Sequence, residues 1–97
     1  MTHRPTLRHI VFFSARDKGD IPKIVEGLSL LGKIPHSSHF EVCRNTQSDA
    51  LSAEVDVVVY AEFESAEAMA AYKADPIYQK SIDIVRPLRE LRIAADI

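Results

Sequence analysis

The chain has 97 residues, enough for a single domain with one hydrophobic core. Its formal net charge of −2 at pH 7 argues against a nucleic-acid or membrane partner, because both favour a strongly basic face. A single cysteine, Cys43, excludes an internal disulfide, and no signal-peptide core or apolar run of membrane-helix length occurs, so we expect a cytoplasmic protein.

Residues 1–6 are expected to form a flexible leader, followed by one domain over residues 7–97. A first strand is predicted over residues 7–15, because apolar side chains occupy both of its alternating faces. One face carries Leu7, His9, Val11 and Phe13, and the other carries Ile10 and Phe12. A strand that is apolar on both faces belongs in the middle of a sheet.

A helix is predicted next, with Asp20 as its cap and Pro22 in its first turn. The apolar residues at helical spacing are Ile21, Ile24, Val25, Leu28 and Leu31. Gly27 lies inside this helix at a cost of about 1 kcal/mol relative to Ala. We interpret it as allowing a close approach to the sheet or leaving space for a ligand. Gly32 is expected to end the helix.

Two strands are predicted over residues 36–44 and 54–64, joined by a turn-rich loop over residues 45–52. The second organises the fold, because Val55, Val57, Val59, Ala61 and Phe63 recur at every second position. The first is less apolar and is expected nearer an edge. Asp56 falls on the other face, where we expect an arginine or backbone donor beside it and a role in dimer register.

Ser65 is expected to cap a second helix that ends near Ala74, before the Asp75-Pro76 break. Residues 77–85 are predicted to add one or two helical turns. Residues 88–95 are predicted to form the last strand.

The order β-α-β-β-α-β predicts an α+β, ferredoxin-like fold: a four-stranded antiparallel sheet with the helices on one face. The helix-free face would then expose a set of apolar side chains, namely Ile10, Phe12, Val58 and Tyr60. Since a contiguous apolar sheet face is rarely left exposed to water, we predict a homodimer that packs through this face.

A resemblance to a known family is carried by an ordered set of segments: HIVFF, KIP, FEVCRN, VDVVVYAEFES, EAMAAYKADPIYQ and RPLRELRIAADI. Together they resemble the stress-responsive α/β-barrel domain (Dabb) family over residues 7–97. This resemblance implies a dimeric α/β-barrel built from ferredoxin-like monomers. Most members of the family have no assigned role, and the resemblance implies no cofactor and no metal.

The chain also resembles, more distantly, a plant polyketide cyclase of this family, olivetolic acid cyclase, which performs cofactor-free aldol chemistry in a pocket between sheet and helices. By that resemblance Tyr72 matches the helper tyrosine, His9 a pocket histidine and Val59 a pocket valine. Tyr78 stands at the place of the catalytic histidine, and Gly27 replaces an aromatic residue. The candidate catalytic residues are therefore His9, Tyr72 and Tyr78.

Three functions follow as hypotheses. The first is a binding protein that holds a small apolar ligand between sheet and helices, with ligand-binding residues Val11, Phe13, Ile24, Gly27 and Val59. The second is a cofactor-independent enzyme, cyclase-like or monooxygenase-like, that uses His9 and Tyr72 for acid–base chemistry. The third is a stress-linked structural or assembly protein. A structural alternative treats His9 as a hydrogen-bonded core residue and both tyrosines as bridges from core to solvent.

Two polar patterns are interpreted as structural. His36 and His39 stand three residues apart in a predicted strand, which places them on opposite faces, so no metal site is predicted. The charged group Arg86, Arg89, Glu90 and Arg92 is interpreted as a solvated face or as salt bridges at the dimer rim.

Overall fold

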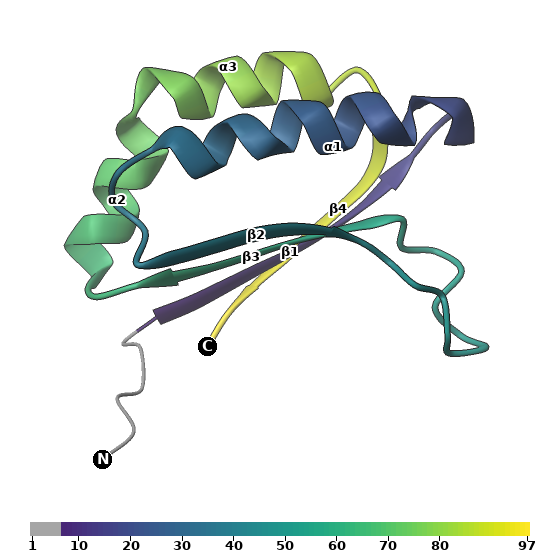
Figure 1. The fold of residues 1–97 in the computed structure, drawn as a ribbon, viewed down its shortest axis with the longest axis horizontal. Coiled ribbons are helices and arrows are strands. Elements are labelled where there is room, and N and C mark those ends of the chain that lie inside the picture. Colours follow the sequence, from purple (N-terminus) through teal and green to yellow (C-terminus); the bar gives the residue numbers. More distant parts are fainter. Residues whose placement is uncertain (1–6) are drawn as a thin grey trace.

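The computed structural model describes residues 7–97 as a four-stranded antiparallel sheet with the helices on one face (Figure 1). The elements in chain order are β1 (Leu7–Ala15), η1 (Lys18–Asp20), α1 (Ile21–Ser29), η2 (Leu30–Lys33), β2 (His39–Arg44), β3 (Val57–Phe63), α2 (Ala66–Ala74), α3 (Pro76–Val85) and β4 (Arg89–Asp96). The predicted order is confirmed, with the last helical region longer than expected. The predicted leader lies outside the described residues.

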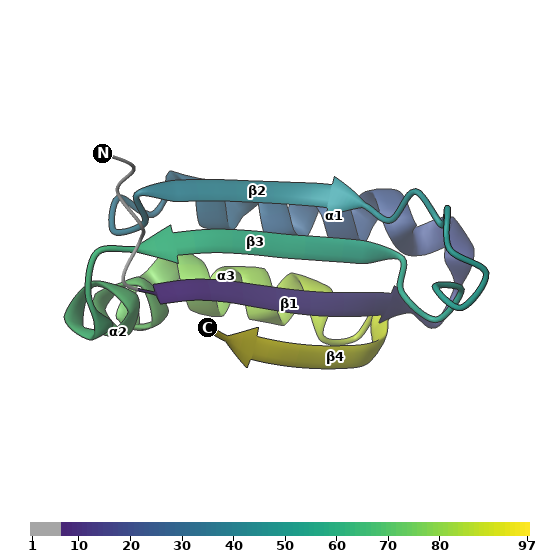
Figure 2. The same cartoon turned by 90° about the horizontal axis from the view of Figure 1, so that it is seen from below.

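The strands are ordered β2-β3-β1-β4 across the sheet, so β3 and β1 lie at its centre (Figure 2). All neighbouring strands are antiparallel, and Val11 of β1 lies opposite Val59 of β3. The strands that the sequence predicts as central are central, and β2 is an edge strand as expected. The side chains of β3 alternate between buried and half-buried, which places one row against the helices.

The core lies between the sheet and the helices. Its buried apolar residues are Val11, Phe13, Ala15, Ile24, Leu28, Leu31, Ile34, Val57, Val59, Ala61, Phe63, Tyr72 and Val85. The members from β1 and β3 all belong to the helix-facing row of their strand. None of the helices within residues 7–97 is long and apolar enough to cross a bilayer.

Both ends of α1 differ from the prediction. Asp20 occupies the cap position, but its side chain makes no capping hydrogen bond. Asp17 instead accepts the backbone N–H of Gly19 at 2.9 Å and starts η1, so the chain has already turned before α1 begins. At the other end the helix tightens into η2 from Leu30, where a side chain at Gly32 would press on the Phe40 ring.

Gly27 brings two helices together, rather than bringing α1 to the sheet or leaving space for a ligand. A Cβ atom at this position would lie 2.8 Å from Cγ2 of Ile84 and 2.9 Å from Cγ2 of Val85, both on α3. The Ser81 hydroxyl of α3 also donates to the Gly27 carbonyl at 2.9 Å. The missing side chain therefore lets α1 and α3 pack in close contact.

Asp56 is buried, and it has partners within its own chain. Its Oδ2 atom accepts the backbone N–H of Ala15 at 2.8 Å and the Lys18 ammonium at 2.7 Å. The expectation of a backbone donor is correct, and the charged partner is Lys18 rather than an arginine. The carboxylate ties the end of β1 and the η1 turn to the start of β3.

Candidate functional site

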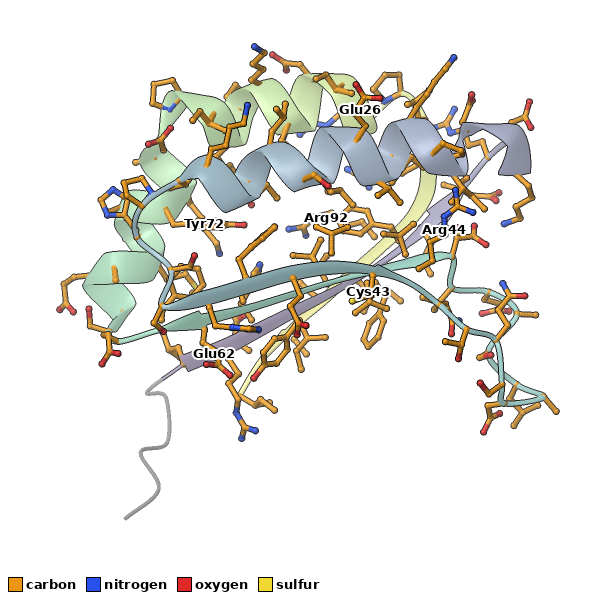
Figure 3. The ribbon with its side chains drawn as sticks, in the orientation of Figure 1. Glu26, Cys43, Arg44, Glu62, Tyr72 and Arg92 are labelled. Carbon is orange, nitrogen blue, oxygen red and sulfur yellow. The ribbon has the colours of Figure 1, made fainter. Side chains whose placement is uncertain are left out.

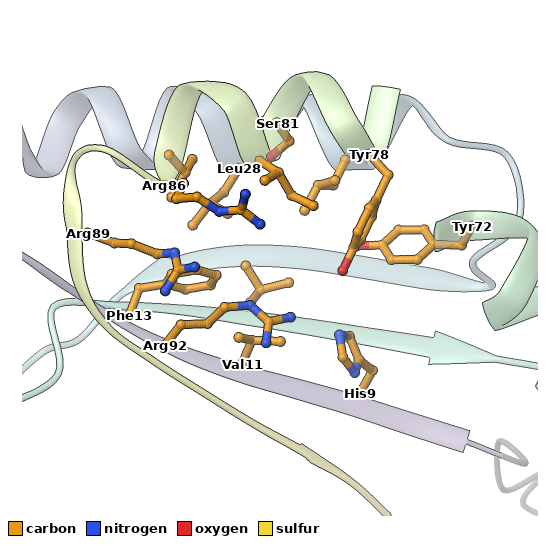
Figure 4. A pocket seen from close by; sticks show the side chains of 14 residues that line it. His9, Val11, Phe13, Leu28, Tyr72, Tyr78, Ser81, Arg86, Arg89 and Arg92 are labelled. Carbon is orange, nitrogen blue, oxygen red and sulfur yellow. The ribbon is translucent and has the colours of Figure 1, made fainter. Parts of the chain in front are cut away.

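A cavity of about 260 Å³ lies between the sheet and α3 (Figure 4). Its lining residues come from both central strands, all three α-helices, η2 and β4: His9, Val11, Phe13, Leu28, Leu31, Val59, Tyr72, Tyr78, Ser81, Ile82, Val85, Arg86, Arg89 and Arg92. Tyr72 and Arg92 both lie in the layer between sheet and helices, whereas Glu62 lies on the opposite side of the sheet (Figure 3). The volume is slightly below the roughly 300 Å³ at which drug-sized sites begin, so it suits a compact molecule.

The apolar wall of the cavity contains three of the five predicted ligand-binding residues. Val11, Phe13 and Val59 line it from the central strands. Ile24 is fully buried in the core beside it, and Gly27 is in contact with α3, so neither lines the cavity. On the helix side, Leu28 and Leu31 line the cavity instead.

His9 is 3% exposed, lines the cavity and is paired with a carboxylate. Its Nδ1 atom lies 2.5 Å from Oδ1 of Asp96, its cross-strand partner on β4. A carboxylate only accepts hydrogen bonds, so Nδ1 carries a proton, and in the neutral ring this leaves Nε2 as an acceptor. Asp96 thereby holds the ring in the tautomer and orientation that a general base requires.

Tyr72 and Tyr78 stand next to each other at the end of the cavity that contains His9 (Figure 4). The Tyr72 ring packs edge-on against Phe63, with centroids 5.0 Å apart, and against Tyr78, with centroids 5.4 Å apart. Burial, and to a lesser extent Tyr78, raises the pKa of the Tyr72 phenol. Its hydroxyl therefore remains a hydrogen-bond donor at neutral pH. The three predicted catalytic residues are thus brought together.

The cavity is also lined by three arginines. Arg86 and Arg92 are exposed, in keeping with the interpretation of these arginines as a solvated face, and Arg89 is half-buried. Arg86 and Arg89 lie away from His9, and the Arg92 side chain extends along the cavity toward Val11 and His9 (Figure 4). Partial burial, followed by the charges of Arg92, Arg86 and Arg16, lowers the pKa of Arg89. Arg86, Arg89 and Arg92 are spaced three residues apart in the sequence. Such a spacing indicates one shared face only within a helix, so it did not predict this cluster.

His36 and His39 do not form part of any metal-binding group. Within residues 7–97 there is no cluster of three or more His, Cys, Asp and Glu side chains that could hold an ion. His39 Nε2 lies 3.2 Å from Oε2 of Glu41, and both side chains are about half exposed.

The sequence matches one family model, that of the stress responsive A/B barrel domain, over residues 7–97. The chain belongs to this family, Dabb. No curated protein matches the sequence. Several solved structures do share the fold of this Dabb chain, at sequence identities low enough that the likeness concerns the fold alone.

A dimeric ferredoxin-like protein of unknown function from Thermobifida fusca is 21% identical, with 98% of each chain covered and a TM-score of 0.79. A Dabb family protein from Mesorhizobium loti is 20% identical, covering 97% of this chain and 96% of the other, with a TM-score of 0.79. A protein from Nitrosomonas europaea, provisionally named an antibiotic biosynthesis monooxygenase, is 16% identical, covering 95% and 96%, with a TM-score of 0.77. These matches confirm the ferredoxin-like fold.

Proposed function

We propose that this Dabb protein is a cytoplasmic homodimer that binds a small, largely apolar molecule in the cavity between its sheet and α3. The cavity of about 260 Å³ carries this proposal, because its apolar side chains would otherwise face water. Val11, Phe13 and Val59 form the sheet side of the binding site, and His9 and Tyr72 supply polar groups at one end. This combination of apolar walls and a few polar groups is typical of small-molecule sites.

The homodimer would form through the helix-free face of the sheet. Ile10, Phe12, Val58 and Tyr60 are only half-buried on this face, and Ile93 of β4 is 54% exposed beside them. Two copies packed face to face would remove this apolar surface from water. The description of the Thermobifida fusca protein as dimeric supports a homodimer, without indicating which face would form the interface.

Binding is tested by titrating 4-propylphenol, a compact neutral probe, into the protein and following methyl signals by NMR. We expect shifts of the Val11, Val59 and Leu28 methyl groups. Val59→Phe, which places a ring inside the cavity, should abolish them. Leu51→Phe adds a ring at a side chain that is 92% exposed and should leave binding unchanged. Shifts confined to residues outside the cavity, or a Val59→Phe variant that binds normally, would refute the proposal.

A second candidate function, a cofactor-independent acid–base enzyme, is favoured by the pairing of His9 with Asp96. His9 Nε2 would accept a proton from an acidic carbon of the bound molecule. The Tyr72 hydroxyl, which makes no hydrogen bond within residues 7–97, would donate to its carbonyl oxygen. This chemistry is common to a cyclase-like enzyme and to the first step of a monooxygenase-like one.

This second function is tested by measuring deuterium exchange at the acidic carbon of 1-phenylbutane-1,3-dione. His9→Ala should slow the protein-catalysed exchange by about 100-fold or more. Asp96→Asn should slow the exchange less, because His9 is still present but no longer has a carboxylate that orients its ring. His39→Ala, which removes a histidine outside the cavity, is the control. An exchange rate that does not change in His9→Ala would refute the enzymatic function and leave the binding proposal intact.

A further inference from the structure

The cavity is lined by three arginines and by no acid that would balance their charge. Arg86 follows α3, while Arg89 and Arg92 belong to β4, and all three line the cavity. No Asp or Glu is among the lining residues. Within residues 7–97 none of the three guanidinium groups takes part in an ion pair. Arg16 adds a further positive charge beside them, since its Nε atom donates to the Arg89 carbonyl at 2.9 Å.

The carboxylates near this cavity have other partners. Asp96 is bound to His9 at the far end, and Asp56 is bound to Lys18 and the backbone of Ala15. Arg86 and Arg92 are exposed and Arg89 is half-buried, and the repulsion among these like charges contributes to the lowered pKa of Arg89. In the ligand-free protein, holding like charges together without a counterion costs free energy. A bound anion would remove this cost.

A β-bulge creates this arrangement. Arg92 lies opposite Phe13 and Leu91 opposite Ser14, but Arg89 lies opposite Ala15, so the register shifts by one residue. In a regular strand, residues 89 and 92 would point to opposite faces. The bulge turns both toward the helices, beside Arg86.

We propose that the ligand of this cavity is an amphipathic acid, whose anionic group binds Arg86, Arg89 and Arg92 while its apolar body lies against Val11, Phe13 and Val59. The inference rests on the proposed binding function and names the chemical class of the ligand. Guanidinium groups match the paired oxygens of a carboxylate or a phosphate, so both anions share the required chemistry. The limited volume restricts the apolar body to about one ring with a short chain.

The inference is tested by isothermal titration of the homodimer with four probes that separate charge from apolar body. The probes are 4-propylbenzoate, its neutral isostere 4-propylbenzamide, acetate and inorganic phosphate. We expect 4-propylbenzoate to bind at least about tenfold more tightly than the amide, because charge-assisted hydrogen bonds form only with the acid. Arg92→Gln should remove that preference. Arg44→Gln, an equal loss of charge on an exposed residue outside the cavity, should retain it.

Each alternative gives a different result. Equal binding of acid and amide would overturn the anionic ligand and leave the apolar binding function standing. Failure of both of these probes and of 4-propylphenol would overturn both proposals. Acetate or phosphate binding as tightly as 4-propylbenzoate would show a site for free anions, which overturns the amphipathic ligand.

Thermal unfolding of the probe-free Arg92→Gln variant provides an independent measurement. We expect its Tm to equal or exceed that of the unmodified protein, because one repulsive charge has been removed. A clear fall in Tm would show that Arg92 already has an acidic partner, such as a carboxylate of the second copy, and would overturn the inference.

Discussion

The two faces of the sheet have similar amino-acid patterns but very different surroundings. On β3, Val57, Val59, Ala61 and Phe63 are at most 1% exposed, because the helices cover them. The side chains that alternate with them, including Val58 and Tyr60, are only half-buried. Burial in this chain therefore depends on which face the helices cover.

The largest difference between the faces should appear when one phenylalanine on each is shortened. Phe63→Ala should lower the free energy of unfolding by about 3–5 kcal/mol, because the fully buried ring packs against Tyr72. Phe12→Ala on the helix-free face should cost clearly less in dilute solution, where the dimer contributes little. Urea unfolding monitored by circular dichroism measures both. Equal losses would show that the comparison is incorrect.

A charge on the helix-free face should separate the two copies without unfolding them. Val58→Lys places an ammonium group in the proposed interface, so the dissociation constant of the dimer should rise by at least about tenfold. Leu51→Lys, in the exposed loop before β3, is the control and should not change it. Sedimentation equilibrium measures the dissociation constant. A Val58→Lys dimer of unchanged strength would place the interface elsewhere.

On the helix-covered face, Gly27→Ala should destabilise the protein by about 1 kcal/mol. The added methyl group overlaps branch methyls of Ile84 and Val85, whose side chains are stiff, and such overpacking costs about 1–3 kcal/mol. The higher helix propensity of Ala returns about 1 kcal/mol. A chemical unfolding curve shows the net change. A stabilised variant would mean that α1 and α3 can separate without cost.

The smallest expected effects concern the tyrosines of the two faces. Burial raises the pKa of Tyr72 above its ordinary 10.0, so its stabilising contribution is complete below that pH and falls as the pH rises toward the raised value. The hydrogen bond to Glu62 is the main cause that raises the pKa of Tyr60. Glu62→Gln should therefore make Tyr60 ionise earlier and leave Tyr72 unchanged.

Phenolate absorbance measures this cleanly, because the chain has three tyrosines and no tryptophan. Tyr72→Phe should remove the step that is delayed by burial. If Glu62→Gln also shifted the ionisation of Tyr72, the tyrosines of the two faces would not titrate independently.

Much of the fold follows from local patterns. The period-two alternation of Val57, Val59 and Phe63 sets the face of β3 that points to the core, and Ser65 caps α2 as predicted by accepting the N–H of Ala68 at 3.1 Å. Asp75-Pro76 separates α2 from α3 for equally local reasons, since Asp75 accepts the backbone N–H of Ile77. Such features are predictable because the interacting atoms lie only a few residues apart.

The candidate site was predictable only where one strand or helix supplies the residue. His9, Val11 and Phe13 share a face of β1, so alternation placed them in the cavity wall. The pairing of His9 with Asp96 joins residues that are 87 positions apart, and it depends on the register between β1 and β4.

The gathering of Arg89 and Arg92 depends on a β-bulge, and the role of Gly27 on the packing of α3 against α1. Strand register, a bulge and a contact between helices arise from how distant segments fit together. Local sequence patterns do not indicate how those segments fit together. The charge and chemistry of the cavity can therefore be described only from the folded structure.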